Sequence, residues 1–232
     1  MAAQGIAQNI VGFKQSIVDN SIVPVVVGSL RLFPDGLIIS SAMFAILTLS
    51  FPFAIFSLSM MESALIFRFL QYSSSFLNIV PAYNTTNDPK CRTGFIQPNT
   101  LLSLSMFSSG QVNSPYPSPP LFMLSTASSY LFATLNAQSK ELQALGPMYS
   151  SRYYVSAIFL SMLLLLFIAF RVLYECDTPG VAMLTVPIGI VLGFVLVWQN
   201  KSLFGDTSIN LLGIPQLYNR AASGEQIYIC PK

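Results

Sequence analysis

Two uncharged apolar stretches, separated by a short polar break, constrain this chain more than any other feature. The first runs from Tyr153 to Phe170 and the second from Gly180 to Gln199, with RVLYECDTPG between them. Each matches the roughly 20 residues that a helix needs to cross the ~30 Å hydrocarbon core of a bilayer, and soluble core helices are rarely apolar all round. Residues 153–199 therefore predict a transmembrane helical hairpin.

The composition extends this prediction to the whole chain. Of its 232 residues, 53% are hydrophobic and 9% are charged, whereas soluble domains carry about 25% charged residues. The net charge is only +2, and no run of Lys or Arg occurs. A lipid bilayer is thus the expected surrounding, and no nucleic-acid partner is expected.

A third uncharged stretch, Gly36 to Met61, predicts the first transmembrane helix, within a segment that spans residues 36–69. Pro52 lies inside this stretch and should kink the helix. Glu62 follows the apolar run directly, which favours a carboxylate at the membrane interface. The fold class expected is mainly α: a polytopic membrane protein with three transmembrane helices that contain no ionisable side chain.

The N-terminal segment, residues 1–35, carries an amphipathic pattern. Ile6, Ile10, Phe13 and Ile17 recur at spacings of 4, 3 and 4 with polar residues between them, which predicts a helix. The helix would lie either in the membrane interface or against the protein itself.

Residues 70–152 are expected to form a long Ser- and Pro-rich loop outside the membrane, with a helix at 121–145. Eight positions along this helix recur at alternating spacings of 3 and 4, six of them leucines and two of them polar, Ser128 and Gln138. This pattern is typical of a coiled-coil-like stripe. The stripe predicts contact with a partner, and the alternative is packing on the membrane or on the protein's own core. Its members are Leu121, Leu124, Leu131, Leu135, Leu142 and Leu145.

The predicted hairpin also carries packing and anchoring signals. Gly189 and Gly193 form GxxxG, which is typical of close helix packing in membranes. Aromatic and basic residues at its ends, where interface anchors are expected, are Arg152, Tyr153, Trp198 and Lys201.

Three spans would place the 171–179 loop on one side and the 70–152 loop with the tail, residues 200–232, on the other. Basic residues near the span ends favour a cytosolic long loop and tail. Cys91 and Cys230 would share a side and could pair, whereas Cys176 could reach neither. In a reducing cytosol free thiols are expected. A glycan on Asn84, in the sequon Asn-Thr-Thr, would mean the inverted orientation.

No catalytic set is evident in the sequence. The chain has no histidine, and its three cysteines are scattered, which removes the commonest general base and the usual metal patterns. The phosphate-binding, dinucleotide and hydrolase motifs are also missing. The expectation is a protein that is not an enzyme, with no cofactor, no metal and no small-molecule substrate.

Three segments resemble membrane-embedded minor capsid and virion membrane proteins of the nucleo-cytoplasmic large DNA viruses. They are SPYPSPPLFMLSTASSYLFATL, ELQALGPMYSSRYY and the ending YICPK. The resemblance covers roughly residues 109–170 and the extreme C-terminus, and it assigns no site residue. It implies a virion inner membrane or a host endoplasmic-reticulum-derived membrane, on whose cytosolic face the capsid is built.

The function expected is a structural one. The protein would anchor a viral capsid to a membrane through its long loop and tail. The alternative is an accessory subunit of a membrane channel, transporter or respiratory-type complex.

Overall fold

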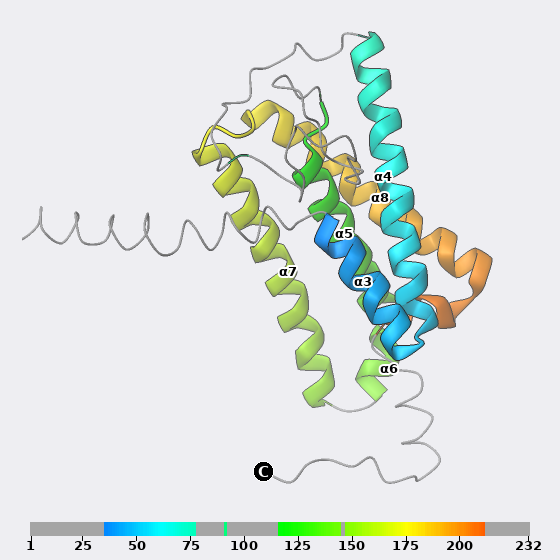
Figure 1. Ribbon diagram of the computed structural model, residues 1–232. Coiled ribbons are helices and arrows are strands. Elements are labelled where there is room, and N and C mark those ends of the chain that lie inside the picture. Colours follow the sequence, from blue (N-terminus) through cyan, green and yellow to red (C-terminus); the bar gives the residue numbers. More distant parts are fainter. Residues whose placement is uncertain (1–34, 78–90, 92–115, 145–146, 212–232) are drawn as a thin grey trace, which may run out of the picture.

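The structure, a computed structural model, describes residues 35–77, 91, 116–144 and 147–211, and in these the regular elements are helices without a β-strand (Figure 1). Three stretches are long and apolar enough to cross a membrane: Phe51–Ser74, Ser151–Leu173 and Pro179–Phe204. The prediction of a mainly helical membrane protein with three such helices is confirmed. The predicted amphipathic helix near the N-terminus, at residues 4–19, lies outside the described residues.

In chain order the elements are α3 (Asp35–Thr48), α4 (Phe51–Leu77), α5 (Pro119–Ala137), α6 (Ser139–Ala144), α7 (Pro147–Leu173), α8 (Pro179–Phe204) and the 3-10 helix η3 (Asp206–Ile209).

The stretch predicted as one kinked helix forms two helices that fold back on each other. Helix α3 ends at Thr48, Leu49 has a left-handed φ of 49°, and α4 begins at Phe51. Pro52 therefore lies in the first turn of α4, where its missing N–H would have no partner in the helix. The Ser57 hydroxyl donates to the Ile38 carbonyl at 3.4 Å, which holds the two helices side by side. The prediction of one helix kinked at Pro52 is wrong because the chain reverses just before the proline.

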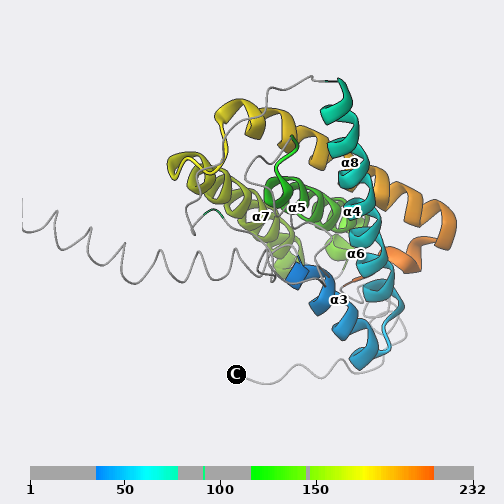
Figure 2. The same ribbon diagram turned by 45° about the horizontal axis from the view of Figure 1, so that its top comes forward.

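Helix α5 lies inside the bundle, although the sequence predicted it in a loop outside the membrane. It packs against α8, α7 and α4, and it runs between α7 and α4 in both orientations (Figures 1 and 2). Fourteen of its 19 residues are buried. At about 1.5 Å per residue it is about 28 Å long, so it can run alongside the three helices that are long and apolar enough to cross a membrane.

The hydroxyl groups of α5 misled the sequence prediction. They lower its hydropathy, yet they donate to backbone carbonyls within the same helix: Ser125 to Leu121 at 2.7 Å, and Thr126 to Phe122 at 2.8 Å. A hydroxyl paired in this way no longer carries the cost of an unpaired polar group in hydrocarbon. The helix can therefore lie at membrane depth despite its serines and threonines.

The main core lies where α4, α5, α8 and η3 meet. Aromatic rings join α4 to α5, with Phe56 and Tyr130 at 5.1 Å and Phe67 and Phe122 at 5.6 Å between centroids. A smaller cluster joins α5 to α7 and α8. The buried members of the main core are Phe56, Met60, Ala64, Phe67, Phe122, Met123, Ala127, Tyr130, Ala133, Leu196, Val197 and Ile209.

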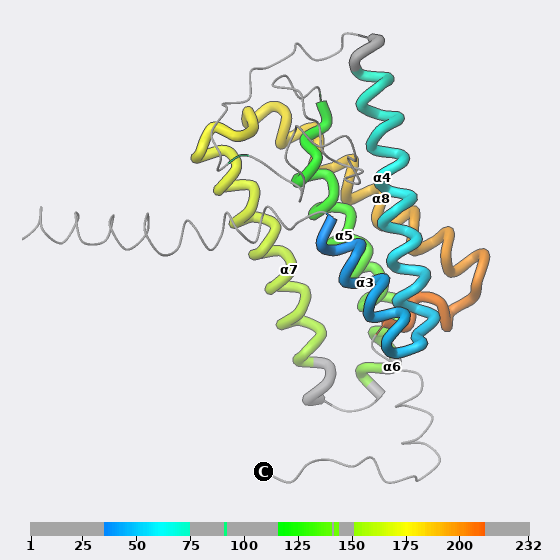
Figure 3. Tube along the Cα trace, in the orientation of Figure 1, coloured from blue at the N-terminus to red at the C-terminus, as the bar shows by residue number. Residues whose placement is uncertain are grey.

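The chain passes up α4, down α5, up α7 and down α8 in the orientation of Figure 3, so the connections gather at two ends. We call one the disulfide end, where α5 begins and where residue 91 is bonded to the α7–α8 connection. The other is the α6 end, where α6, the start of α7 and η3 lie. Ser74 donates to the Tyr116 carbonyl at 2.5 Å at the first end, and Gln138 donates to Asn210 at 3.3 Å at the second.

Candidate functional site

A buried ion pair and a disulfide close the disulfide end. Arg171 Nε donates to Asp177 Oδ2 at 2.6 Å, and the two side chains are only 5% and 1% exposed. The same guanidinium donates to the carbonyl of Cys91 at 3.2 Å. Cys91 is bonded to Cys176, with 5.1 Å between the Cα atoms. Residue 91 is thus fixed to the α7–α8 connection by a covalent bond and a charge-assisted hydrogen bond.

The start of α5 joins the same cluster. Ser118 donates through its hydroxyl to Asp177 at 2.9 Å, and its N–H donates to Thr185 of α8 at 3.3 Å. Just before it, the Tyr116 hydroxyl donates to the Leu184 carbonyl at 3.3 Å. Burial raises the pKa of Tyr116 above its usual value of 10.0, so this hydroxyl keeps the proton that it donates. One carboxylate therefore connects α5 to the α7–α8 turn.

The disulfide corrects the predicted topology. Cys176 was expected to be out of reach of Cys91, and free thiols were expected; the structure bonds these two cysteines. The reason is α5, whose extra passage brings the 171–179 connection to the same end as residue 91. Helix α8 leads from this end to η3 at the α6 end, so the tail follows on from the end opposite residue 91. Cys230 lies outside the described residues.

Gly189 and Gly193 bring α8 against α5. A Cβ on Gly189 would meet Ser125 and come within 2.8 Å of the Phe122 carbonyl oxygen. A Cβ on Gly193 would come within 2.5 Å of the Thr126 carbonyl oxygen. The two helix backbones are therefore in contact, and the helix that packs on this glycine face is α5.

A second polar cluster lies inside the bundle towards the α6 end. Asn200 of α8 donates to Ser59 of α4 at 2.7 Å and to the Tyr130 hydroxyl of α5 at 3.0 Å. Ser208 of η3 donates to the Asn200 carbonyl at 3.1 Å. All four side chains are buried. The Asn200 amide thus joins α8 to α4 and α5, and the Asn200 backbone carbonyl joins α8 to η3. Burial also makes Asn200, the first residue of a sequon, inaccessible to a modifying enzyme.

Glu62 lies within the first span, which corrects the expectation that the spans contain no ionisable group. The span Phe51–Ser74 includes both Glu62 and Arg68. Gln199 of α8 donates to the two carboxylate oxygens of Glu62 at 3.1 and 3.2 Å. The sequence prediction placed Glu62 at the interface because it began the helix 15 residues too early.

The leucine stripe is divided between the protein's interior and a groove. Leu121 and Leu124 pack in the smaller core cluster, and Leu142 of α6 is buried. Leu131 and Leu135 are half-buried and line the groove described below. The stripe is therefore not a continuous surface for a partner, and Leu145 lies outside the described residues.

The predicted interface anchors lie at the α6 end. Arg152 is exposed in the first turns of α7, and the Tyr153 hydroxyl donates to Asn136 at 3.4 Å. On α8, Trp198 is 72% exposed, and Lys201 pairs with Asp206 at 2.8 Å on the surface.

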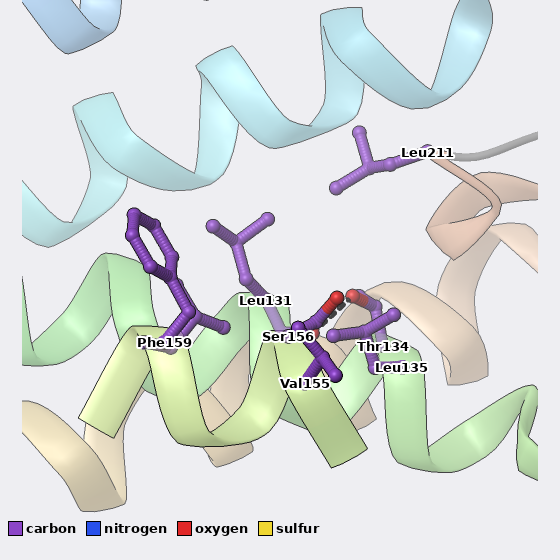
Figure 4. Close-up of a pocket in the computed structure, with 8 residues that line it drawn as sticks. Leu131, Thr134, Leu135, Val155, Ser156, Phe159 and Leu211 are labelled. Carbon is purple, nitrogen blue, oxygen red and sulfur yellow. Dashed lines mark hydrogen bonds between the residues drawn. The ribbon is translucent and has the colours of Figure 1, made fainter. Parts of the chain in front are cut away.

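An open groove of about 370 Å³ separates α5 from α7 near the α6 end (Figure 4). Its walls are mostly apolar, and the Thr134 hydroxyl donates to the Leu131 carbonyl at 2.7 Å. No sequence pattern indicated this groove, because its two walls come from separate segments. The lining residues are Leu131, Thr134 and Leu135 of α5, Val155, Ser156, Phe159 and Leu160 of α7, and Leu211.

Metal-binding chemistry finds no support among the described residues, which contain no group of three His, Cys, Asp or Glu side chains placed to hold an ion. Comparisons with protein-family models, curated proteins and solved structures find no match.

Proposed function

We propose that this protein is a structural membrane protein that holds a protein shell, a viral capsid, to a lipid membrane. The observation that carries the proposal is the contact between the α5 and α8 backbones at Gly189 and Gly193. Helices in backbone contact leave no path for a solute between them. A bundle whose helices are packed in this way is suited to a structural role.

The polar groups inside the bundle support the same reading. The Asn200 amide joins α8 to Ser59 and Tyr130, and Arg171 is neutralised by Asp177. Hydrogen bonds of this kind hold membrane helices together. These polar groups bond to other groups of the bundle, so they are not available to line a pathway for a solute.

The disulfide favours one orientation. Disulfides persist in oxidising compartments, so the disulfide end would face the lumen and the α6 end the cytosol. The resemblance to virion membrane proteins implies a capsid on the cytosolic face. The shell contact is thus assigned to the α6 end and the tail, and the long loop is assigned to the other face.

Removal of residues 212–232 tests the proposal. The full chain should remain with the shell protein after detergent removes the lipid, and the shortened chain should stay in the detergent fraction. A tail of equal length made of Gly and Ser is the matched control and should behave like the deletion. Both variants must keep the Cys91–Cys176 disulfide, which shows that the bundle is intact. Equal retention of the shortened chain would contradict the proposed shell contact.

The second candidate is an accessory subunit of a membrane complex, and two observations favour it. In residues 151–173 of α7 the buried side chains are Phe167 and Arg171, so a broad apolar face is available to another helix. The Glu62 carboxylate lies at membrane depth, where ionisable groups often mark function. An accessory subunit should co-purify with a membrane complex that gives solute flux after reconstitution, and this outcome would displace the shell anchor.

A further inference from the structure

We propose that the groove between α5 and α7 binds an acyl chain of an anionic phospholipid, whose headgroup contacts Arg152. This inference concerns lipid recognition and does not depend on the shell-anchoring function. It rests on the chemistry of the groove, its continuity with the bilayer-facing surface and the position of one basic side chain.

The groove offers apolar walls to its occupant. Leucine, valine and phenylalanine side chains form most of its lining, and the Thr134 hydroxyl is turned back to its own helix at 2.7 Å. A headgroup or a polar peptide would leave hydrogen bonds unmade in such a groove. A hydrocarbon chain loses none.

The groove is continuous with the surface that faces lipid. Val155 and Phe159 of α7 line it and are 63% and 54% exposed. They belong to the span Ser151–Leu173, which is the least covered of the three by the rest of the chain. An acyl chain from the surrounding bilayer can therefore enter from the side.

Arg152 supplies the position and charge for a headgroup. It precedes Val155, Ser156 and Phe159 by 3, 4 and 7 residues, so it lies on the same stripe of α7, one turn nearer the helix start. Its side chain is exposed, and Lys140 is exposed on α6, which packs against α7. A guanidinium binds phosphate oxygens in pairs, so a phospholipid with its chain in the groove would place its phosphate near this charge.

The expected effect is an enrichment of anionic over zwitterionic lipid at the groove. A basic side chain near a membrane surface favours anionic lipid by about fivefold. The enrichment should be confined to the groove, because residues 153–170 of α7 carry no further charge.

Fluorescence quenching by brominated lipids measures this enrichment. The single tryptophan is replaced (Trp198→Phe), and a reporter is introduced by Phe159→Trp in the groove. Leu166→Trp, on the same face two turns further along, is the matched control. The full chain is reconstituted in phosphatidylcholine vesicles that contain a small fraction of brominated phosphatidylglycerol or brominated phosphatidylcholine.

The reporter at position 159 should reach a given degree of quenching at about fivefold lower mole fraction of brominated phosphatidylglycerol than of brominated phosphatidylcholine. The reporter at position 166 should be quenched equally by the two lipids. Arg152→Gln should remove the difference at position 159, and Arg152→Lys should retain most of it. Equal quenching at position 159 by the two lipids would overturn the proposal, as would a difference that Arg152→Gln leaves unchanged. A third outcome would also overturn the proposal: the reporter at position 159 is shielded from both lipids, and the shielding is lost when residues 212–232 are removed. That result would show that the tail fills the groove.

Discussion

At the scale of single residues, the close packing of α8 on α5 depends on glycines, which carry only a hydrogen atom where other residues have a Cβ. Gly193 faces backbone atoms of α5, the Thr126 carbonyl oxygen and the Tyr130 nitrogen, which cannot rotate away as a side chain could. Gly180, in the first turn of the same helix, has open space where its Cβ would be. The two glycines therefore form a matched pair for substitution.

Gly193→Ala should destabilise the bundle by about 1–3 kcal/mol, because α8 must move away from α5 to admit the methyl group. Gly180→Ala should change the free energy of unfolding by less than about 0.5 kcal/mol. Thermal unfolding in detergent, followed by helical circular dichroism, measures both. Equal stability of the two variants would show that the helices are not in backbone contact.

Asp177→Ala should be more damaging than the loss of both members of its ion pair. The single substitution leaves the Arg171 guanidinium buried without its carboxylate, which costs about 3–5 kcal/mol. Asp177→Ala combined with Arg171→Met removes the stranded charge and should recover a large part of that loss. Thermal unfolding of the single and double variants, with the disulfide intact in each, measures how much stability the second substitution recovers. No recovery in the double variant would mean that the guanidinium is stabilised mainly by other contacts.

At the scale of helices, hydropathy predicted the positions of α7 and α8 because lipid-facing helices must be apolar along their whole length. It could not predict α5, since a helix shielded by others can carry hydroxyls that bond to its own carbonyls, as Ser125 does. It also merged α3 with α4, because both are apolar and the reversal at Leu49 depends on backbone conformation rather than on polarity. The Asn200 cluster and the groove escaped prediction because their members come from helices far apart in the sequence.

The turn between α3 and α4 should tolerate glycine better than the native residue. Leu49 has a φ of 49° and is 91% exposed, so its side chain contributes little packing while its Cβ opposes the left-handed backbone. Leu49→Gly should stabilise the protein by up to about 1 kcal/mol, and Leu49→Val should destabilise it because a β-branched side chain suits this conformation least. Unfolding temperatures that rank valine above glycine would contradict a reversal at this position.

At the scale of the whole molecule, α5 decides which connections share a face of the membrane. Thirteen residues join the end of α4 to Cys91, too few for a chain to cross a bilayer and return. We therefore expect Asn84 to be on the same side of the membrane as the disulfide. A side that permits disulfide formation is also the side on which sequons are modified.

Asn84 should accordingly carry a glycan when the protein is made in microsomes, and Asn200 should carry none because it is buried among α4, α5 and α8. Endoglycosidase treatment should shift the mobility of the native chain and leave an Asn84→Gln variant unchanged. An unmodified Asn84 beside an oxidised Cys91–Cys176 pair would mean that the disulfide forms on the cytosolic side. The orientation assigned to the shell contact would then reverse.

The bond between Cys91 and Cys176 joins positions 85 residues apart, and it makes a covalent ring that contains α5, α6 and α7. A single protease cut anywhere within that ring opens it without dividing the molecule. The two pieces would migrate together on a non-reducing gel and separate after reduction. The protein should thus keep both of its membrane faces covalently connected after one such cut.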